Sequence, residues 1–421
     1  MPTSSHSLTP AKERTVLLAL VGVQFTHILD FMIMMPLGPQ LMRVFEITPA
    51  QFTHLVAAYA FAAAIAGFAG GFVLDRYDRK RALLIAYAGF GLATLACGLA
   101  PTHHLLLVAR LAAGAFGGVA GSLVSAMMAD IIPPERRGRA MSFVMSAFPI
   151  ASVLGIPVGL ELAGKFGWQA PFLFLAACAA LNLVLGSIAL PHLRTAVRDN
   201  HPFRQMREIL AHGLHLRAFA LGASLVLAGG CLIPFIATAM VTNYGLAEAQ
   251  LSKVYAAGGV ATLFSMIAIG RLSDRMDRMH LLAWLSAAAV AVVLVMTNLG
   301  RTSLAASCAI MALFMVTMSG RFAPAMTMVT NAVAARYRGG FMSVNSALQQ
   351  GASALANLLA GIFVTRGPDG RLVGFPLLGL VSVGFFALTV VLAARLRSAA
   401  PHVARNLPAP PATATPAEAA A

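Results

Sequence analysis

Two stretches of this 421-residue chain decide its fold. Residues 71–80 read GFVLDRYDRK, and residues 270–279 read GRLSDRMDRM. Gly, Asp, Arg, Asp and Arg recur at matching places, at an offset of 199 residues. A second pair follows in nearly the same register, because residues 137–142 read RGRAMS and residues 338–343 read RGGFMS, at an offset of 201. Self-similarity at a fixed offset indicates a repeated structural unit, so the sequence predicts two related halves in parallel orientation.

Long apolar runs flank each copy of this repeat. The chain is 59% hydrophobic and 11% charged, whereas soluble proteins average about 25% charged residues. Lipid accepts only helical bundles or closed barrels, and these runs are long enough for helices. Twelve stretches can be marked, at 15–41, 52–74, 82–100, 104–130, 140–164, 170–190, 218–243, 249–270, 280–299, 304–334, 341–365 and 373–395. The sequence therefore predicts an all-α integral membrane protein with 12 transmembrane helices in two six-helix bundles.

The apolar stretches divide the chain into five parts. We expect a cytoplasmic N-terminal segment (1–14), an N-terminal six-helix bundle (15–190), a cytoplasmic linker with an amphipathic helix (191–217), a C-terminal six-helix bundle (218–395) and a disordered Ala/Pro-rich cytoplasmic tail (396–421). Phe203, Met206, Ile209 and Leu210 recur at helical spacing in the linker. They predict a short helix at the membrane surface, and a helix that binds a partner protein is the alternative.

The distribution of basic residues predicts the orientation. The net charge is +15, but the basic residues lie in short loops between apolar runs, so we expect no nucleic-acid partner. With the N-terminus in the cytoplasm, 22 Lys and Arg residues fall on the cytoplasmic side, 6 on the opposite side and two within spans. Cytoplasmic loops carry the excess of Lys and Arg. We therefore expect a multi-pass protein of the bacterial inner (plasma) membrane with both termini cytoplasmic. The polar residues 1–14 precede a long first span, which argues against a cleaved signal peptide.

Three motifs resemble those of a known family. The Gly-x-x-x-Asp-Arg-x-x-Arg-Lys loop at 71–80 resembles the loop between helices 2 and 3 of the major facilitator superfamily, and residues 106–114 resemble its helix-4 motif. Gly155, Pro157 and Gly159, followed by residues 167–172, resemble helix 5 of the drug:proton antiporter branch, especially its sugar-efflux-like permeases. The resemblance implies alternating access around a cavity between the halves, and a coupling role for Arg110 in helix 4.

Asp30 is the candidate proton-coupling group. It lies about midway along the first predicted span, where a charge costs about 2.5–3.5 kcal/mol on insertion scales. Burial destabilises the charged carboxylate, so it can exchange a proton; a structural salt bridge is the alternative. Arg110 lies about 7–8 Å away in depth and is the predicted partner, either as a coupling group or in a fixed buried pair. His27, three residues before Asp30 on the same helix face, is either a proton relay or a hydrogen-bond partner.

Arg321 lies in the tenth span, and the predicted spans of the second half contain no acidic residue. It therefore either contacts an anionic or carbonyl-bearing substrate or pairs with Asp30 or Glu161 across the halves. Glu161 by default is a solvated surface group. Polar and adaptable side chains within spans complete the predicted substrate cavity, which consists of Gln24, Met34, Tyr59, Arg321, Asn345 and Gln349.

The repeated loops predict a cytoplasmic gate. Topology requires only Lys and Arg, so the recurrence of Asp in both copies favours ion pairs that lock the halves in an outward-open state. Retention of charge for topology is the alternative. The predicted gate residues are Gly71, Asp75, Arg76, Arg79, Asp130, Asp274, Arg275 and Arg278.

Several chemistries have no support in the sequence. There is no phosphate-binding loop, no HExxH and no GxSxG motif, and the four cysteines have no CxxC spacing. We therefore expect no catalytic residue, no metal and no cofactor, with a proton gradient as the energy source. The sequence predicts a monomeric secondary transporter in the lipid bilayer that moves a small-molecule substrate by proton-coupled efflux. A proton-driven importer of an organic anion and a non-transporting membrane receptor or scaffold are the alternatives.

Overall fold

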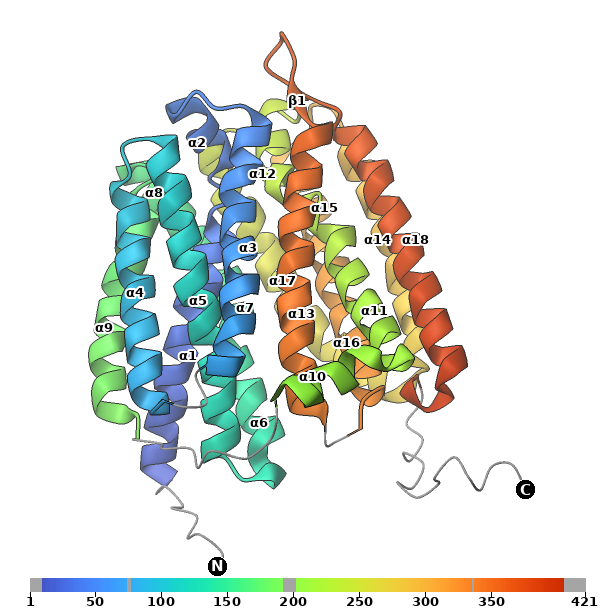
Figure 1. Ribbon diagram of the computed structural model, residues 1–421. Helices are drawn as coiled ribbons and strands as arrows, with labels where there is room; N and C mark the ends of the chain where they lie inside the picture. The colour runs from blue at the N-terminus through green and yellow to red at the C-terminus, as the bar shows by residue number, and fades with distance from the viewer. Residues whose placement is uncertain (1–9, 74–76, 192–201, 335–336, 405–421) are drawn as a thin grey trace, which may run out of the picture.

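The computed structural model describes residues 10–73, 77–191, 202–334 and 337–404, and it is almost entirely helical (Figure 1). The first half contains α1 (Pro10–Ile33), α2 (Gly38–Val44), α3 (Pro49–Val73), α4 (Arg79–Leu99), α5 (His103–Ile131), α6 (Pro134–Met145), α7 (Ala147–Ile150), a π-helical turn (Ala151–Gly155), α8 (Ile156–Phe166) and α9 (Ala170–Ala189). We call the end at which α1 begins and α18 ends, at the bottom of Figure 1, the lower end, and the opposite end the upper end.

The second half repeats this pattern after the linker. It contains α10 (Pro202–Ala211), α11 (Gly213–Gly230), α12 (Ile233–Thr242), a 3-10 turn (Glu248–Gln250), α13 (Leu251–Arg275), α14 (Arg278–Asn298), α15 (Leu304–Gly320), α16 (Phe322–Asn331), α17 (Arg338–Phe363), α18 (Phe375–Ala399) and a second 3-10 turn (Pro401–Val403). A small antiparallel hairpin at the upper end joins α17 to α18. Its strands are β1 (Thr365–Arg366) and β2 (Leu372–Val373), with Thr365 opposite Val373 and Arg366 opposite Leu372.

Membrane-length helices confirm the predicted fold class. Among the described residues, eleven helical segments are long and apolar enough to cross a membrane. The remaining predicted span, the eleventh in chain order, is α17, which is 26 residues long and more polar, with Asn345 and Asn357 almost fully buried. This helix packs against α3 and α11 in the middle of the molecule, so its polar side chains face protein. On the outer helices, by contrast, Ile85, Ile188 and Trp284 are at least 70% exposed, as expected for a surface in contact with lipid.

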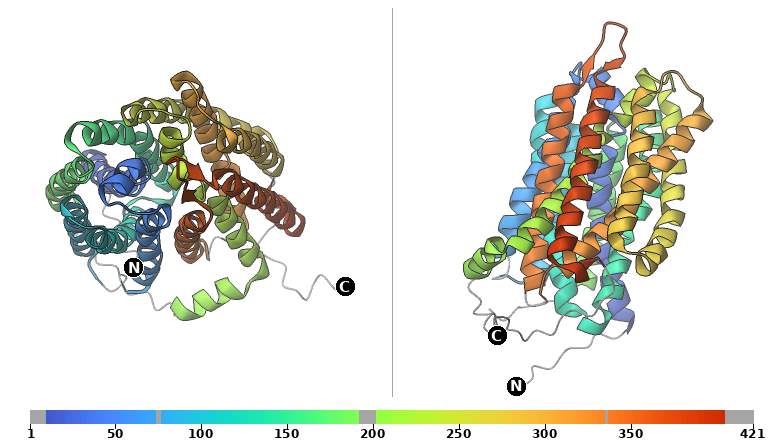
Figure 2. Two further views of the ribbon diagram at one scale, coloured as in Figure 1. Left: turned by 90° about the horizontal axis from the view of Figure 1, so that it is seen from above. Right: turned by 90° about the vertical axis from the view of Figure 1, so that its right-hand side faces the viewer.

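The two halves share one hydrophobic core at the upper end. This cluster combines Ile33 and Phe52 of the first half with Phe235 and Phe375 of the second. Toward the lower end each half has a separate core, one that includes Val124 and one that includes Phe341 and Leu221 among its members. Figure 2 shows the halves side by side when the molecule is seen from above. Contacts across the halves run from α3 to α17, from α2 to α12, and from α8 and the π turn to α13. The upper end is therefore closed by packing.

Four predicted spans are interrupted, and one of them is the fifth, which is divided into α6, α7, the π turn and α8. The first ends at Ile33 rather than at residue 41, and α2 follows as a separate short helix. The seventh breaks between Gly230 and Ile233, and the tenth breaks at Arg321. The hydropathy pattern does not mark these breaks, but prolines do, since Pro36, Pro234 and Pro324 lie at or just after them.

The predicted linker helix is present as α10, which lies across the lower end of the second half (Figure 1). Its apolar face packs partly on protein rather than on lipid alone, since Ile209 is 1% exposed within the lower core of the second half. His215 Nδ1 on α11 donates a hydrogen bond of 3.0 Å to the Ile209 carbonyl oxygen, and Tyr337 donates one of 2.9 Å to Glu208. The helix is therefore fixed to the bundle through backbone and side chain.

Candidate functional site

A buried ion pair joins α1 to α5. Asp30 and Arg110 are both 0% exposed. Arg110 Nη1 donates hydrogen bonds of 2.7 Å to Asp30 Oδ2 and 3.2 Å to the Asp30 carbonyl oxygen, and Thr94 of α4 donates one of 3.2 Å to Asp30 Oδ1. A buried carboxylate is stable in its charged form only with such partners. Because protonation of Asp30 removes the charge that holds Arg110, this contact can respond to a proton.

A tyrosine completes the surroundings of the pair. The guanidinium carbon of Arg110 lies 4.4 Å from the ring centroid of Tyr59 on α3, a cation–π contact. Tyr59 in turn donates a hydrogen bond of 3.4 Å to the His27 carbonyl oxygen. Gly114 permits this arrangement, since a Cβ there would lie 2.2 Å from the Tyr59 carbonyl oxygen. Four helices, α1, α3, α4 and α5, therefore meet at one charged centre.

Polar groups continue from this centre toward the lower end. Gln24, His27 and Asp30 are three residues apart on α1 and so share one helix face. Both ring nitrogens of His27 and Oε1 of Gln24 are buried and have no hydrogen-bond partner among the described residues. The ring of His27 lies between those of Tyr59 and Phe90, with centroids 5.9 and 6.2 Å away. Water is the natural partner for such unsatisfied groups, so the row can carry a proton toward Asp30.

The predicted helix-5 motif positions α1 beside this row. Pro157 has no N–H to donate to the preceding turn, and residues 151–155 adopt the π-helical turn that often accompanies such a defect. A Cβ on Gly155 would lie 2.7 Å from Leu29, and one on Gly159 would lie 2.6 Å from Ile33. The two glycines therefore let the fifth span pack closely against α1 on either side of Asp30.

A second buried arginine lies in the other half. Arg321 is 1% exposed, at the break between α15 and α16. Its guanidinium carbon lies 4.1 Å from the ring centroid of Phe386 on α18, and its Nη2 lies 3.2 Å from the sulfur of Met318. Its Nε and Nη1 have no hydrogen-bond partner in the described part of the chain. The predicted pairing of Arg321 with Asp30 or Glu161 is wrong for this structure, because Asp30 pairs with Arg110 and Glu161 accepts a hydrogen bond of 2.7 Å from Ser252.

The other predicted cavity residues fall in separate places. Gln24 and Tyr59 lie beside the Asp30 pair, whereas Met34 is fully buried in the shared upper core and acts there as a packing residue. Asn345 and Gln349 on α17 lie close to Gly222 of α11, where a Cβ would lie 2.7 Å from Asn345 Oδ1 and 3.5 Å from Gln349 Nε2. The structure therefore does not bring the six predicted residues into one lining.

At the lower end, the repeated loops are braced within each half. Asp78 accepts a hydrogen bond of 2.9 Å from the backbone N–H of Arg81 and so begins α4, and Arg79 pairs with Asp130 at 3.3 Å. Asp277 caps α14 in the same way by accepting from Met279 N. Both of these aspartates are N-caps, the role for which Asp is favoured.

The predicted gate therefore has a partial outcome. Asp277 pairs with Arg397 at 2.9 Å, and Arg278 is 6% exposed, so these charges also stay within the second half. Asp274 and Arg275 are exposed at the end of α13. Gly71 lies in the last turns of α3, while Asp75 and Arg76 lie outside the described residues. That these loops form ion pairs between the halves in an outward-open state stays a prediction.

The polar contacts that join the halves at the upper end were not predicted. Arg43 of α2 forms a two-bonded ion pair with Glu248, and Ser252 of α13 donates to Glu161 of α8. The hydrogen bond with Glu248 raises the pKa of Arg43 above its ordinary value, so Arg43 stays charged. We call these two contacts the upper latch. No motif marks them, since each joins residues more than 90 positions apart.

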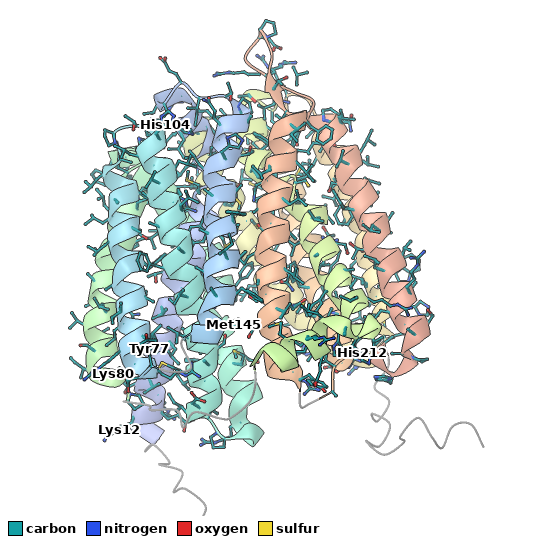
Figure 3. The ribbon with its side chains drawn as sticks, in the orientation of Figure 1. Lys12, Tyr77, Lys80, His104, Met145 and His212 are labelled. Carbon is teal, nitrogen blue, oxygen red and sulfur yellow. The ribbon has the colours of Figure 1, made fainter. Side chains whose placement is uncertain are left out.

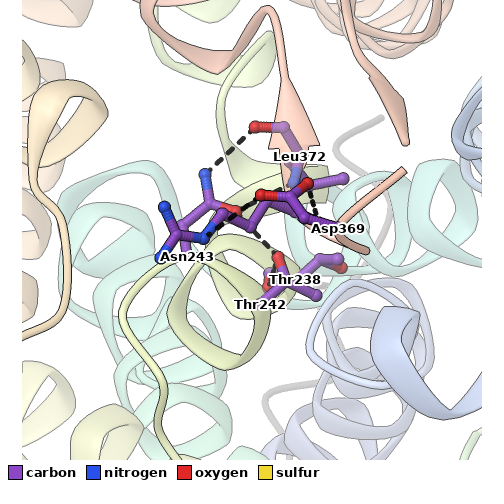
Figure 4. Close-up of polar contacts among 6 residues, drawn as sticks. Thr238, Thr242, Asn243, Asp369 and Leu372 are labelled. Carbon is purple, nitrogen blue, oxygen red and sulfur yellow. Dashed lines mark hydrogen bonds and ion pairs between the residues drawn. The ribbon is translucent and has the colours of Figure 1, made fainter. Parts of the chain in front are cut away.

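The hairpin above α17 is also tied to the upper end (Figure 4). Asn243 donates a hydrogen bond of 3.1 Å to the Leu372 carbonyl oxygen and accepts one of 2.9 Å from Leu372 N. Thr242 donates to Asn243 over 3.0 Å. The side-chain amide of Asn243 therefore pairs with β2 as another strand would. In the described ranges, no group of three His, Cys, Asp or Glu residues has the arrangement of a metal site.

Comparison with known proteins identifies the fold family. The sequence model of the Major Facilitator Superfamily matches residues 20–226 and, a second time, residues 218–420. The chain belongs to the major facilitator superfamily. The double match agrees with the internal repeat, and the family places the chain among multi-pass membrane transporters rather than enzymes.

Curated relatives cover parts of the chain. The uncharacterized MFS-type transporter YceJ of Bacillus subtilis is 26% identical over 61% of this chain and 66% of its own length. Multidrug resistance protein 2 of Bacillus subtilis is 29% identical over 41% of this chain and 43% of its own. A probable 4-methylmuconolactone transporter of Cupriavidus pinatubonensis is 26% identical over 60% of each. The chain thus spans no more than two thirds of the length of these relatives.

Two solved structures share the fold at low identity. A bacterial homologue of the human lysosomal transporter Spinster, in an inward-facing and occupied conformation, aligns with a TM-score of 0.76 and 16% identity over 96% of this chain and 100% of that one. The POT family transporter PepTSo aligns with a TM-score of 0.74 and 11% identity over 93% of this chain and 98% of that one. At these identities the two alignments show that the chain shares their fold, and no more.

Proposed function

We propose that this protein is a proton-coupled antiporter that exports a small organic molecule across the bacterial inner membrane by alternating access. The lower end faces the cytoplasm, and Asp30 carries the coupling proton. The single observation that carries the proposal is the fully buried pair of Asp30 and Arg110. An ionisable pair inside a membrane domain is expensive and is a functional hypothesis by default.

Charge supports the orientation. Lys12 and Lys80 lie at the lower end, where Figure 3 also places Tyr77. The sequence count of 22 Lys and Arg residues on this side against 6 on the other follows the rule that cytoplasmic loops are the more basic. The first helix, α1, begins at the lower end, and the last, α18, ends there (Figure 1).

The arrangement of the halves supports alternating access. The upper end is closed by a shared core and by the upper latch, while the lower cores are separate. This is the packing of a transporter that is closed toward the outside. In the reverse state, the shared core and the latch separate, and the lower ends approach each other around the same central pathway.

A coupling cycle follows from the ion pair. With Asp30 charged, its carboxylate on α1 accepts hydrogen bonds from Arg110 on α5 and from Thr94 on α4, and so connects three helices. Protonation of Asp30 releases Arg110, which then needs another acceptor. A proton that enters from the outer side and leaves toward the cytoplasm therefore alternates the charge at the centre of the first half. Multidrug resistance proteins among the relatives support export of organic molecules by this cycle.

The test is Asp30→Asn in proteoliposomes under an imposed pH gradient. The transported probes are ethidium, chloramphenicol and 2-naphthoate, which are cationic, neutral and anionic. We expect the variant to lose gradient-driven flux while the matched control Asp369→Asn, whose carboxylate is 61% exposed, keeps it. Gradient-driven flux through Asp30→Asn at the wild-type rate would contradict the assignment.

Proton-driven import of an organic anion is the second candidate, because Arg321 has no acidic partner among the described residues. The same liposomes distinguish the two directions. Export predicts that a probe moves against an opposing proton flow, whereas import predicts that probe and proton enter together. Dissipation of the gradient by a protonophore stops either process, so the sign of the probe movement decides.

A further inference from the structure

We propose that the transported molecule carries an anionic group, a carboxylate or a chemically similar oxyanion, which pairs with Arg321 in the second half. This inference deepens the transport function proposed above and rests on it. It concerns a site separate from the Asp30 pair, so each can fail alone.

The two buried arginines have unequal surroundings. Each guanidinium stacks on an aromatic ring, Arg110 on Tyr59 at 4.4 Å and Arg321 on Phe386 at 4.1 Å. Arg110 also has a carboxylate at 2.7 Å, whereas the nearest acceptor for Arg321 is the sulfur of Met318 at 3.2 Å. Thioether sulfur is a weak acceptor. The first half therefore supplies its own counter-charge, and the described part of the second half supplies none.

An uncompensated buried cation is strongly unfavourable. Nε and Nη1 of Arg321 are buried without any hydrogen-bond partner among the residues that the structure describes. A ligand oxyanion would satisfy both the charge and these donors, since guanidinium groups bind carboxylates and phosphates through several N–H bonds. The apolar neighbours Phe386 and Met318 favour an organic anion over a strongly hydrated one.

Two helix breaks lie beside Arg321, and such breaks are typical of binding sites in transporters. The seventh span breaks after Gly230, and the tenth breaks at Arg321 itself. The two breaks face each other, because a Cβ on Gly229 would lie 2.9 Å from Met318 Sδ and 3.8 Å from Arg321 Nη2. Discontinuous helices inside a membrane domain are where transporters bind substrates. The flexible side chain of Met318 lies against both the guanidinium and the helix end at the break in the seventh span.

The test measures binding to the purified full-length protein in the absence of any gradient. The probes are acetate, benzoate and 2-naphthoate, each compared with its amide, and binding is followed by the shift in thermal unfolding temperature. We expect benzoate or 2-naphthoate to stabilise the wild type while its amide does not. Loss of hydrogen bonds to a charged group costs about 1.5–3 kcal/mol, so Arg321→Gln weakens binding about 10- to 100-fold.

Two further variants keep the result interpretable. Arg321→Lys retains the charge without the planar fork, so we expect intermediate binding and a folded protein if the glutamine variant unfolds. Arg301→Gln removes an exposed upper charge as a matched control and should bind as the wild type does.

Three outcomes overturn the proposal. The first is that a carboxylate probe and its amide bind equally well, or that neither binds. The second is that the folded Arg321→Gln protein binds the carboxylate as tightly as the wild type does. The third is equal stabilisation by chloride, which would assign the site to an inorganic anion. Asp30→Asn should keep carboxylate binding, so loss of proton coupling alone leaves this inference standing.

Discussion

Closure of the upper end depends on a glycine, and Gly259→Ala should weaken it. Gly259 lies on α13 where this helix crosses the π turn of the fifth span, in the other half. A Cβ at this position would lie 2.8 Å from both the carbonyl oxygen of Ser152 and the Cα of Val153. Nonbonded carbon atoms normally lie about 3.5–4.0 Å apart. The π turn and α13 must therefore move apart by about 1 Å to make room for one methyl group.

The magnitude follows from that displacement. Overpacking of this kind costs about 1–3 kcal/mol, and it acts only in the state that brings α13 onto the π turn. The gain in helix propensity from Gly to Ala is about 1 kcal/mol, but it is the same in both states and cancels. Because each 1.4 kcal/mol is tenfold in an equilibrium, Gly259→Ala should increase the fraction of upper-open molecules about 5- to 150-fold.

A cysteine placed where the two halves meet at the upper end reports this shift. Thr238 is 3% exposed, and its hydroxyl would lie 3.1 Å from a Cβ on Gly38 of α2, so Thr238→Cys is covered while the upper end is closed. A membrane-impermeant maleimide should label it at least five-fold faster when Gly259→Ala is present. Gly384→Ala, on α18 with no atom within 4 Å of the added Cβ, is the matched control. Equal labelling rates in the two variants would refute the reasoning.

Three other measurements probe the remaining contacts. Glu248→Gln should increase labelling of the same cysteine only about two- to five-fold at low salt, because exposed ion pairs contribute about 0–1 kcal/mol, and high salt should abolish the difference. Since its raised pKa keeps Arg43 charged, varying the pH from 7 to 9 should leave the latch unchanged; a loss of closure over that range would exclude the Arg43 ion pair as its basis. Arg110→Gln should destabilise the purified protein by about 3–5 kcal/mol by stranding a buried carboxylate, and Asp30→Asn in addition should restore part of that loss; additive losses in denaturant unfolding would mean that the two do not interact.

Motifs and periodicity predict the architecture of this chain because they are local. The repeated loops at 71–80 and 270–279 predict two halves, and apolar length predicts the number of spans. Asp30 and Arg110 also stand out in the sequence, since a charge in an apolar run is costly. Their pairing is also predicted from their depths, and the structure supplies the geometry of the contact, 2.7 Å between Arg110 Nη1 and Asp30 Oδ2.

The contacts between distant spans carry no such local signal. Thr94, Ser252 and Phe386 are ordinary residues of apolar spans, and only their partners make them part of a site. Charge alone predicts that Arg321 either contacts a substrate or pairs with an acid of the first half. Choosing between them requires a side-chain direction that sequence periodicity does not supply in helices apolar all round. The break at residue 321 sets this direction; Gly320 and Pro324 mark it in the sequence, but they do not fix where the Arg321 side chain points.

Packing connects the ion pair to the seam between the halves. Leu29 and Ile33, on either side of Asp30, contact the fifth span at Gly155 and Gly159, and the π turn that ends at Gly155 contacts α13 at Gly259. Each contact is too tight to accept a methyl group without a shift, so a displacement of α1 passes to the seam rather than being absorbed. A change in the charge of Asp30 that moves α1 against the fifth span therefore acts on the contact that closes the upper end. In the proposed cycle, protonation of Asp30 would therefore act on the contact at Gly259 through packed side chains and backbone, without a chain of polar groups between them.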